Sequence, residues 1–125
     1  MITRILMAAM FGLTLATHAA AEPKASKGPN GGAVVRVEDH PIEFVVGDQE
    51  IVFYIGDHDG KPMPTKGAKA RAVIQDGGKT ITITLTPTPP NLFVGKLASP
   101  LAPKARVVFS TVFDGHSLQA RFGAP

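Results

Sequence analysis

Hydrophobic and polar residues alternate along much of this chain in short runs, a pattern typical of β-strands that bury one face. The clearest runs are residues 42–46 and 51–55, which flank Asp48-Gln49. If Asp48-Gln49 forms a two-residue turn, one face of the pair becomes a continuous apolar ladder, as cross-strand packing requires. The cross-strand partners are then Gly47 with Glu50, Val46 with Ile51, Phe44 with Phe53 and Ile42 with Ile55. The pattern therefore predicts a β-hairpin with a defined register.

Two further hairpins are predicted by stronger turn signals. Residues 69–75 and 79–86 flank Gly77-Gly78, and residues 105–113 and 116–122 flank Asp114-Gly115. Such dipeptides favour tight turns because glycine adopts positive φ without a steric penalty. The predicted partners are Ile74 with Ile81, Ala72 with Ile83, Ala70 with Leu85, Phe113 with His116, Phe109 with Ala120 and Val107 with Phe122. Residues 87–90 (PTPP) are predicted to end the strand before them, because proline cannot donate a ladder hydrogen bond.

Shorter strand-like runs at residues 33–37 and 91–97 complete the predicted set. No segment beyond the N-terminal region has apolar residues at helical spacing with a capping residue. Seven to eight short strands separated by turn signals indicate an all-β fold, an antiparallel Ig-like β-sandwich. A small closed barrel is the alternative architecture.

The N-terminal residues have the pattern of a Sec-type signal peptide. Arg4 lies in a short basic start, residues 5–16 are apolar, and Ala19-Ala20-Ala21 provides a small-residue cleavage site. The apolar stretch is shorter than the roughly 20 residues that span a bilayer, so stable membrane insertion is not expected. We predict a signal peptide at residues 1–21, a flexible leader at 22–31 and a β-sandwich domain at 32–125, exported to the periplasm.

Composition excludes several classes of function. The chain has no cysteine, which rules out disulfides and thiolate metal ligands. It has 13 basic and 10 acidic residues, and removing Arg4 with the signal peptide leaves 12 against 10, with no basic run. This near balance does not favour a nucleic-acid partner. No serine lies in a nucleophile motif and no carboxylate pair has a catalytic context, so an enzyme is not predicted.

A candidate metal site lies at one end of the first hairpin. The register places His40 opposite Asp57 and next to His58, and imidazole with carboxylate is a common ligand combination for transition metals. His40 has the parity of the core-facing residues, whereas a regular strand would direct His58 to the other face from Asp57. The alternative is that residues 57–60 form a simple polar turn, with His40 at the rim of the core.

Met63 and His116 are two further candidates. Met63 stands between Pro62 and Pro64, and a thioether suits Cu(I) when imidazoles lie nearby. The alternative is that Met63 is an apolar plug over the end of the sheet. His116 follows the Asp114-Gly115 turn and faces Phe113, so it is predicted to be a partly packed strand residue rather than a ligand. Its approach to His40 depends on a strand order that the pattern does not define.

Several short motifs carry a family resemblance across nearly the whole predicted mature chain. They are Gly-Pro-Asn-Gly-Gly at 28–32, His-x-Ile-Glu-Phe at 40–44, Asp-His-Asp-Gly-Lys-Pro at 57–62 and Asp-Gly…Ala-Arg-Phe at 114–122. In this order they resemble small periplasmic proteins and domains associated with heavy-metal efflux, which occur beside or fused to the adaptor subunits of resistance-nodulation-division pumps. The resemblance implies a β-sandwich that binds or passes metal ions, with His40 and His58 at family-like positions. Lys27 is a departure, since such sequences often carry a histidine there.

These observations together predict an exported accessory protein for heavy-metal efflux or homeostasis. Its partner would be an efflux adaptor or another periplasmic protein. A copper- or zinc-like ion would bind weakly, with His40, Asp57, His58 and Met63 as ligands. The alternative function is a non-metal interaction module that docks a membrane complex or a polypeptide by strand addition at an exposed sheet edge.

Overall fold

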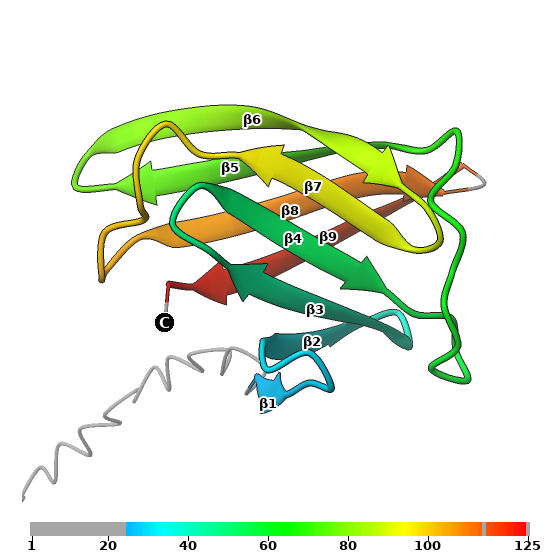
Figure 1. Cartoon of the computed structure of the whole chain (residues 1–125). Helices are drawn as coiled ribbons and strands as arrows, with labels where there is room; N and C mark the ends of the chain where they lie inside the picture. Colours follow the sequence, from blue (N-terminus) through cyan, green and yellow to red (C-terminus); the bar gives the residue numbers. More distant parts are fainter. Residues whose placement is uncertain (1–24, 114, 125) are drawn as a thin grey trace, which may run out of the picture.

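The computed structural model describes residues 25–113 and 115–124, which form nine β-strands and no helix (Figure 1). The strands are β1 (Ser26–Lys27), β2 (Ala33–Val37), β3 (His40–Val46), β4 (Glu50–Ile55), β5 (Lys69–Asp76), β6 (Lys79–Thr88), β7 (Leu92–Lys96), β8 (Arg106–Phe113) and β9 (His116–Gly123). They make a single antiparallel sheet in the order β1-β2-β3-β4-β7-β6-β5-β8-β9. Within this part of the chain, no helix has the length and apolarity needed to cross a membrane.

The sheet curls so that its two halves face each other, with β3, β4 and β7 on one side and β5, β8 and β9 on the other (Figure 1). The prediction of an all-β, antiparallel fold is confirmed. The finer prediction, an Ig-like sandwich of seven to eight strands, is not confirmed, because nine strands form one continuous sheet. The chain connects the halves through β6, which pairs with β5 along its first part and with β7 at its end.

The continuity of the sheet depends on a proline that was predicted to end a strand. β6 continues through Pro87 to Thr88, and Pro87 lies opposite Phe93 of β7. The ladder with β5 stops at Leu85, so beyond that residue β6 has a neighbour on only one side. Proline is tolerated where the side that lacks the N–H has no partner strand. The prediction that the strand ends before Pro87 is therefore wrong, and its extension joins the two halves.

The registers of all three predicted hairpins are confirmed. In β3 and β4, Ile42 lies opposite Ile55 and Phe44 opposite Phe53, and the Gly47 amide donates to the Glu50 carbonyl across the turn, 2.8 Å away. In the other two hairpins every predicted pair is present, from Ala70–Leu85 to Ile74–Ile81 and from Val107–Phe122 to Phe113–His116. Alternating apolar residues and tight turns therefore determine these local pairings.

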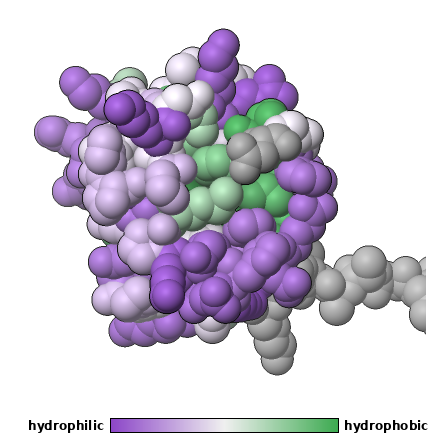
Figure 2. All heavy atoms as spheres, turned by 90° about the vertical axis from the view of Figure 1, so that its right-hand side faces the viewer, coloured by the Kyte–Doolittle hydropathy of each residue, from purple (hydrophilic) through white to green (hydrophobic). Residues whose placement is uncertain are grey.

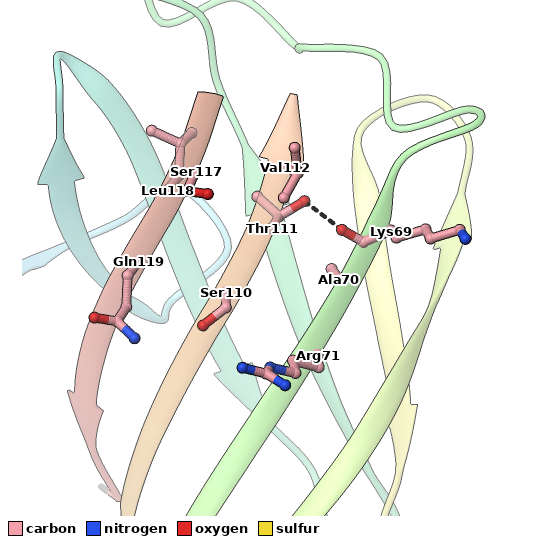
Figure 3. Close-up of a pocket in the computed structure, with 9 residues that line it drawn as sticks. All are labelled: Lys69, Ala70, Arg71, Ser110, Thr111, Val112, Ser117, Leu118 and Gln119. Atoms are coloured by element: carbon pink, nitrogen blue, oxygen red, sulfur yellow. Dashed lines mark hydrogen bonds between the residues drawn. The ribbon is translucent and has the colours of Figure 1, made fainter. Parts of the chain in front are cut away.

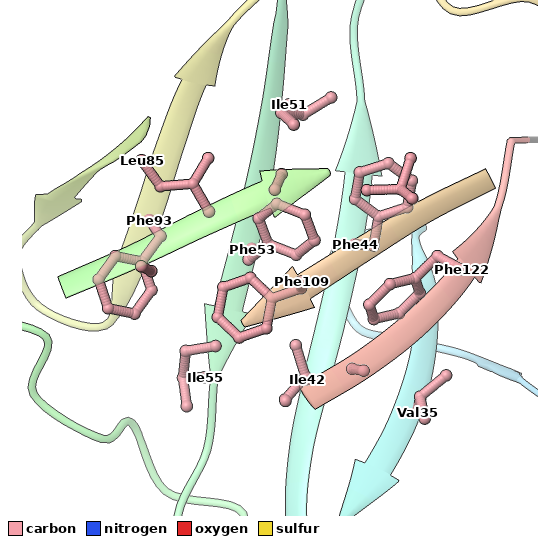
Figure 4. Close-up of a cluster of buried hydrophobic side chains, with 14 of the residues drawn as sticks. Val35, Ile42, Phe44, Ile51, Phe53, Ile55, Leu85, Phe93, Phe109 and Phe122 are labelled. Atoms are coloured by element: carbon pink, nitrogen blue, oxygen red, sulfur yellow. The ribbon is translucent and has the colours of Figure 1, made fainter. Parts of the chain in front are cut away.

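A cluster of phenylalanines fills the space between the two halves (Figure 4). The ring of Phe53 on β4 lies 5.0 Å from that of Phe44 and 4.5 Å from that of Phe109 on β8, measured between centroids. Phe53 and Phe109 are completely buried. Truncating such a residue to alanine typically destabilises a domain by about 3 to 5 kcal/mol. The cluster therefore packs both halves of the sheet into one core.

The N-terminal segment differs from the predicted flexible leader. Residues 1–24, which include the predicted signal peptide, lie outside the described residues. From Ser26 the chain is attached to the sheet, because β1 pairs with β2 and a buried carboxylate, Glu43, binds the loop that follows. Glu43 is 4% exposed and accepts hydrogen bonds from the Asn30 backbone amide, its side-chain amide and the Gly32 amide, at 2.8 to 3.1 Å for the shortest contact of each. A side chain at Gly32 would collide with the carbonyl of Phe44, so the loop lies tightly against β3.

Candidate functional site

The end of the sheet that contains the β2–β3 and β8–β9 turns has a cavity of about 420 Å³ with an unusual lining. Three histidines, a methionine and two carboxylates surround it together with two apolar residues. They are Glu38, Asp39, His40, His58, Met63, Phe113, His116 and Leu118. We call this the histidine pocket. Figure 2 views this end of the molecule and shows a hydrophobic area within a mostly hydrophilic surface.

His40, the first residue of β3, is half-buried and held by a backbone hydrogen bond. Its Nδ1 lies 3.0 Å from the carbonyl oxygen of Gly56. Because a carbonyl only accepts hydrogen bonds, Nδ1 carries the proton in this contact. The neutral ring then has its lone pair on Nε2, the nitrogen that can bind a metal ion or accept a proton. A hydrogen bond of this type orients metal-binding histidines in many proteins.

His58 lies beside His40, although a regular strand would have separated the two side chains. The ring centroids are 4.5 Å apart, with an angle of 50° between the ring planes. The strand does not continue past Gly56, whose amide donates to the Pro41 carbonyl, and the chain then folds back so that the Asp57 amide donates to the Lys61 carbonyl. The expectation that His40 and His58 diverge is therefore replaced by a direct contact. The alternative prediction of a turn at residues 57–60 is also correct, since the Gly60 amide donates to the Asp57 carbonyl.

Asp57 does not line the histidine pocket. The ladder between β3 and β4 ends at the Ile42–Ile55 pair, so Asp57 is not cross-strand paired with His40 as predicted. One oxygen of its carboxylate, Oδ1, accepts the amide of Asp59 at 2.9 Å and that of Lys61 at 2.8 Å. These bonds are those of an Asx-type turn. The carboxylate therefore stabilises the loop that presents His58.

Met63 returns the chain to the end of the core. Its amide donates to the carbonyl of Ile55, 3.0 Å away, and its half-buried side chain packs against the hydrophobic core while also lining the histidine pocket. The position of Met63 is therefore compatible with both predictions, an apolar plug over the end of the core and a part of the candidate site. The thioether is placed within the same cavity as the three imidazoles.

His116 is the lining residue whose approach to His40 the sequence left open. It faces Phe113 across the β8–β9 turn, as predicted, but the curl of the sheet brings this turn to the same end as His40. The strand order puts β9 at the far edge of the sheet, while β2 lies against it. No local pattern defines such a contact between distant hairpins. A histidine directly after a strong turn was the only available signal.

The β2–β3 turn supplies both carboxylates of the histidine pocket. Val37 pairs with His40, which leaves Glu38 and Asp39 as a two-residue turn with φ of 48° and 66°. Positive φ at both positions is the geometry that glycine or asparagine usually provides, and side chains such as glutamate adopt it at a cost of about 1 to 2 kcal/mol each. The two carboxylates are thus held beside the histidines by an unfavourable backbone conformation.

The described side chains do not form a complete metal site as they stand. Among residues 25–113 and 115–124, no group of three or more His, Cys, Asp or Glu is arranged so that it could hold a metal ion. The histidine pocket therefore contains donors of suitable chemistry whose nitrogen and oxygen atoms do not yet converge. Binding of an ion would require rotation of side chains around the cavity.

Comparison with known proteins gives no match for this chain among the families, the curated proteins or the solved structures searched.

Proposed function

We propose that this protein binds a copper- or zinc-like metal ion in the histidine pocket. The single observation that supports the proposal best is the close contact of His40 and His58, in a cavity that Met63 and His116 also line. His40, His58 and His116 would supply imidazole nitrogens and Met63 a thioether. Asp57, predicted as a ligand, would act instead by holding the loop that carries His58.

The spacing of the two contacting imidazoles is compatible with a shared ion. A zinc ion lies about 2.0 to 2.1 Å from a histidine nitrogen, so two imidazoles on one tetrahedral ion have ring centres roughly 5 Å apart. The centroids of His40 and His58 are 4.5 Å apart. Rotation of the rings about their side-chain torsions would direct a nitrogen of each toward one ion. His40 already has its Nε2 available because Nδ1 is engaged with Gly56.

The mixed donor set leaves two classes of ion to distinguish. Imidazoles with nearby carboxylates suit zinc, whereas imidazoles with a thioether suit Cu(I). Met63 separates the two, because only a soft ion gains from its sulfur. The exposed position of His58 and His116 favours a site that exchanges its ion with solvent or a partner.

Titration of the folded domain with Zn(II) by calorimetry, and with Cu(I) in competition with a chromogenic chelator, tests the proposal. We expect His40→Ala/His58→Ala to weaken binding by about 100-fold, which is about 2.7 kcal/mol. His116→Ala should weaken it by about tenfold, or about 1.4 kcal/mol. Met63→Leu should reduce the affinity for Cu(I) and leave that for Zn(II) unchanged, because only the soft ion gains from the thioether.

Gln49→Ala is the matched control, since Gln49 is exposed at the opposite end of the same hairpin. It should bind metal as the wild type does. Absence of binding by the wild type, or equal binding by wild type and the double histidine variant, would show that the histidine pocket is not a metal site.

The cellular role that we propose is an exported accessory protein for heavy-metal efflux or homeostasis. The signal-peptide pattern of residues 1–21 supports the periplasmic location. The link to efflux, and to a pump adaptor as partner, is supported by the sequence resemblance alone.

A further inference from the structure

Charged residues are distributed very unevenly along this chain. Between residues 38 and 59 every charged side chain is acidic. From residue 60 onward basic residues dominate, and the acidic ones are Asp76 and Asp114. The basic residues of this second part are Lys61, Lys66, Lys69, Arg71, Lys79, Lys96, Lys104, Arg106 and Arg121. The small net charge therefore conceals two parts of opposite sign.

The fold collects several of these cations on one surface, the outward face of β6, β5, β8 and β9. Residues on this face lie in rows across the strands, as the ladder registers define. The central row contains Thr84, Arg71, Ser110 and Gln119. The row on one side of it contains Lys69, Val112 and Ser117. The row on the other side contains Val73, Val108 and Arg121. Arg106 also lies on this face, while Asp76, the acidic residue of these strands, has the parity of core-facing Ile74. We call this surface the basic face.

The basic face has a groove at the end nearest the histidine pocket. A hollow of about 490 Å³ crosses β5, β8 and β9, between Lys69 and Arg71 on one side and Ser117 and Gln119 on the other. Figure 3 shows Arg71, Ser110 and Gln119 side by side on the three strands. A hydrogen bond links β8 to β5 at one edge of the groove, where the buried Thr111 hydroxyl donates to the Lys69 carbonyl at 2.8 Å.

We propose that the basic face binds an acidic polypeptide segment, independently of any metal in the histidine pocket. Lys69 and Arg71 are alternate residues of one strand, so their side chains emerge about 6.7 Å apart. Alternate carboxylates of an extended segment have the same spacing. Between the cations, Ser110, Ser117 and Gln119 offer directional donors and acceptors that suit a peptide backbone.

An anionic membrane is the other polyanionic surface that this face could meet, and the structure favours it less. Membrane-binding surfaces usually insert large apolar or aromatic side chains among their cations. On the basic face Val112 is 52% exposed, whereas Val73 and Val108 are half-buried, and no aromatic side chain points outward from the four strands. A groove also fits an extended chain better than a flat bilayer.

Fluorescence anisotropy with a labelled peptide of alternating Glu and Ser tests the proposal, with a Gln/Ser peptide as the uncharged probe. We expect the wild type to bind the acidic peptide and Lys69→Glu/Arg71→Glu to bind it at least about tenfold more weakly. Raising the salt concentration from about 0.05 to 0.5 M should weaken binding, because the Debye length shortens. Lys69→Gln/Arg71→Gln gives the same comparison with a smaller change in charge.

Lys96→Glu/Lys104→Glu is the matched control, since it makes the same change in net charge at two exposed residues outside the basic face. It should change the affinity less than threefold if the site is local. Equal losses in both charge-reversal variants would overturn the proposal and indicate only a general charge effect. Sedimentation of phosphatidylglycerol vesicles with the protein, but no peptide binding, would assign the face to lipid instead. Self-association abolished by Lys69→Glu/Arg71→Glu would identify a second copy as the occupant.

Discussion

Two turns of this protein both have positive φ at their two central residues, but one consists of glycines and the other of acidic residues. The β5–β6 turn consists of Gly77 and Gly78, with φ of 54° and 87°. The β2–β3 turn consists of Glu38 and Asp39, with φ of 48° and 66°. Glycine adopts this conformation without a Cβ penalty, whereas glutamate and aspartate do not. The same local shape is thus relaxed in one hairpin and unfavourable in the other.

The two turns also differ in whether they line a cavity. The glycine turn lines none of the cavities described above, whereas the Glu38-Asp39 turn contributes both of its side chains to the histidine pocket. An unfavourable backbone conformation beside a cluster of histidines is a pattern seen at functional sites. The comparison therefore predicts that the Glu-Asp pair serves the pocket rather than the stability of the hairpin. Three substitutions test this, in order of expected effect.

Glu43→Ala should have the largest effect on the free energy of unfolding. It provides a reference value for a carboxylate that is required for the stability of the fold. Removing the buried carboxylate leaves three N–H donors of the 30–32 loop without their acceptor, and we expect a loss of about 3 kcal/mol in the free energy of unfolding. Urea denaturation followed by circular dichroism measures it. Glu50→Ala, at an exposed residue, should stay within about 0.5 kcal/mol. A similarly small effect at Glu43 would mean that the loop contributes nothing to stability.

Gly77→Glu/Gly78→Asp transfers the acidic pair into the relaxed turn. With φ positive at both positions, we expect a loss of about 2 kcal/mol. The same denaturation experiment measures the loss, and Gly77→Asn, which tolerates this conformation, is the control. If the double variant were as stable as the wild type, the two turns would not differ in strain and the comparison would fail.

Glu38→Asn/Asp39→Gly makes the reverse change and should have the smallest effect on stability, a gain of about 1 kcal/mol. The structure also predicts a cost at the histidine pocket, where two carboxylates are lost, so the affinity for Zn(II) should fall a few-fold. Denaturation and calorimetry on the same variant measure both. A variant with higher stability and unchanged metal affinity would show that the acidic turn has no part in the site.

The sequence was sufficient for local pairings and insufficient for contacts between hairpins. Alternating apolar residues gave three registers correctly, with a Gly-Gly or Asp-Gly turn in two of the hairpins and Asp48-Gln49 in the third. The β2–β3 turn was not predicted because Glu38-Asp39 lacks the residues that usually mark such a turn. The passage of β6 through Pro87 was not predicted because proline normally ends a strand, and its tolerance depends on where the β5 ladder stops.

The same limit applies to the candidate site. His40, His58 and Met63 belong to one continuous stretch of chain, and the structure brings all three to one cavity. Asp57 was assigned to the site from an extended register, but the ladder ends two pairs earlier, at Ile42–Ile55, since the chain turns at Gly56. His116 is separated from the others by more than half of the domain. Its position depends on the curl of the whole sheet, which no local pattern encodes.

The location of the histidine pocket has a topological consequence. His40 is on β3, near one edge of the sheet, and His116 is on β9, the strand at the other edge. β2 and β9 lie against each other, but among the described strands no hydrogen-bond ladder joins them. A ligand held by His40 and His116 together would therefore act as a staple across the open side of the curl. With free ligand at 100 times the dissociation constant, binding would stabilise the folded protein by about 2.7 kcal/mol, so that occupancy of the pocket would be coupled to the stability of the whole sheet.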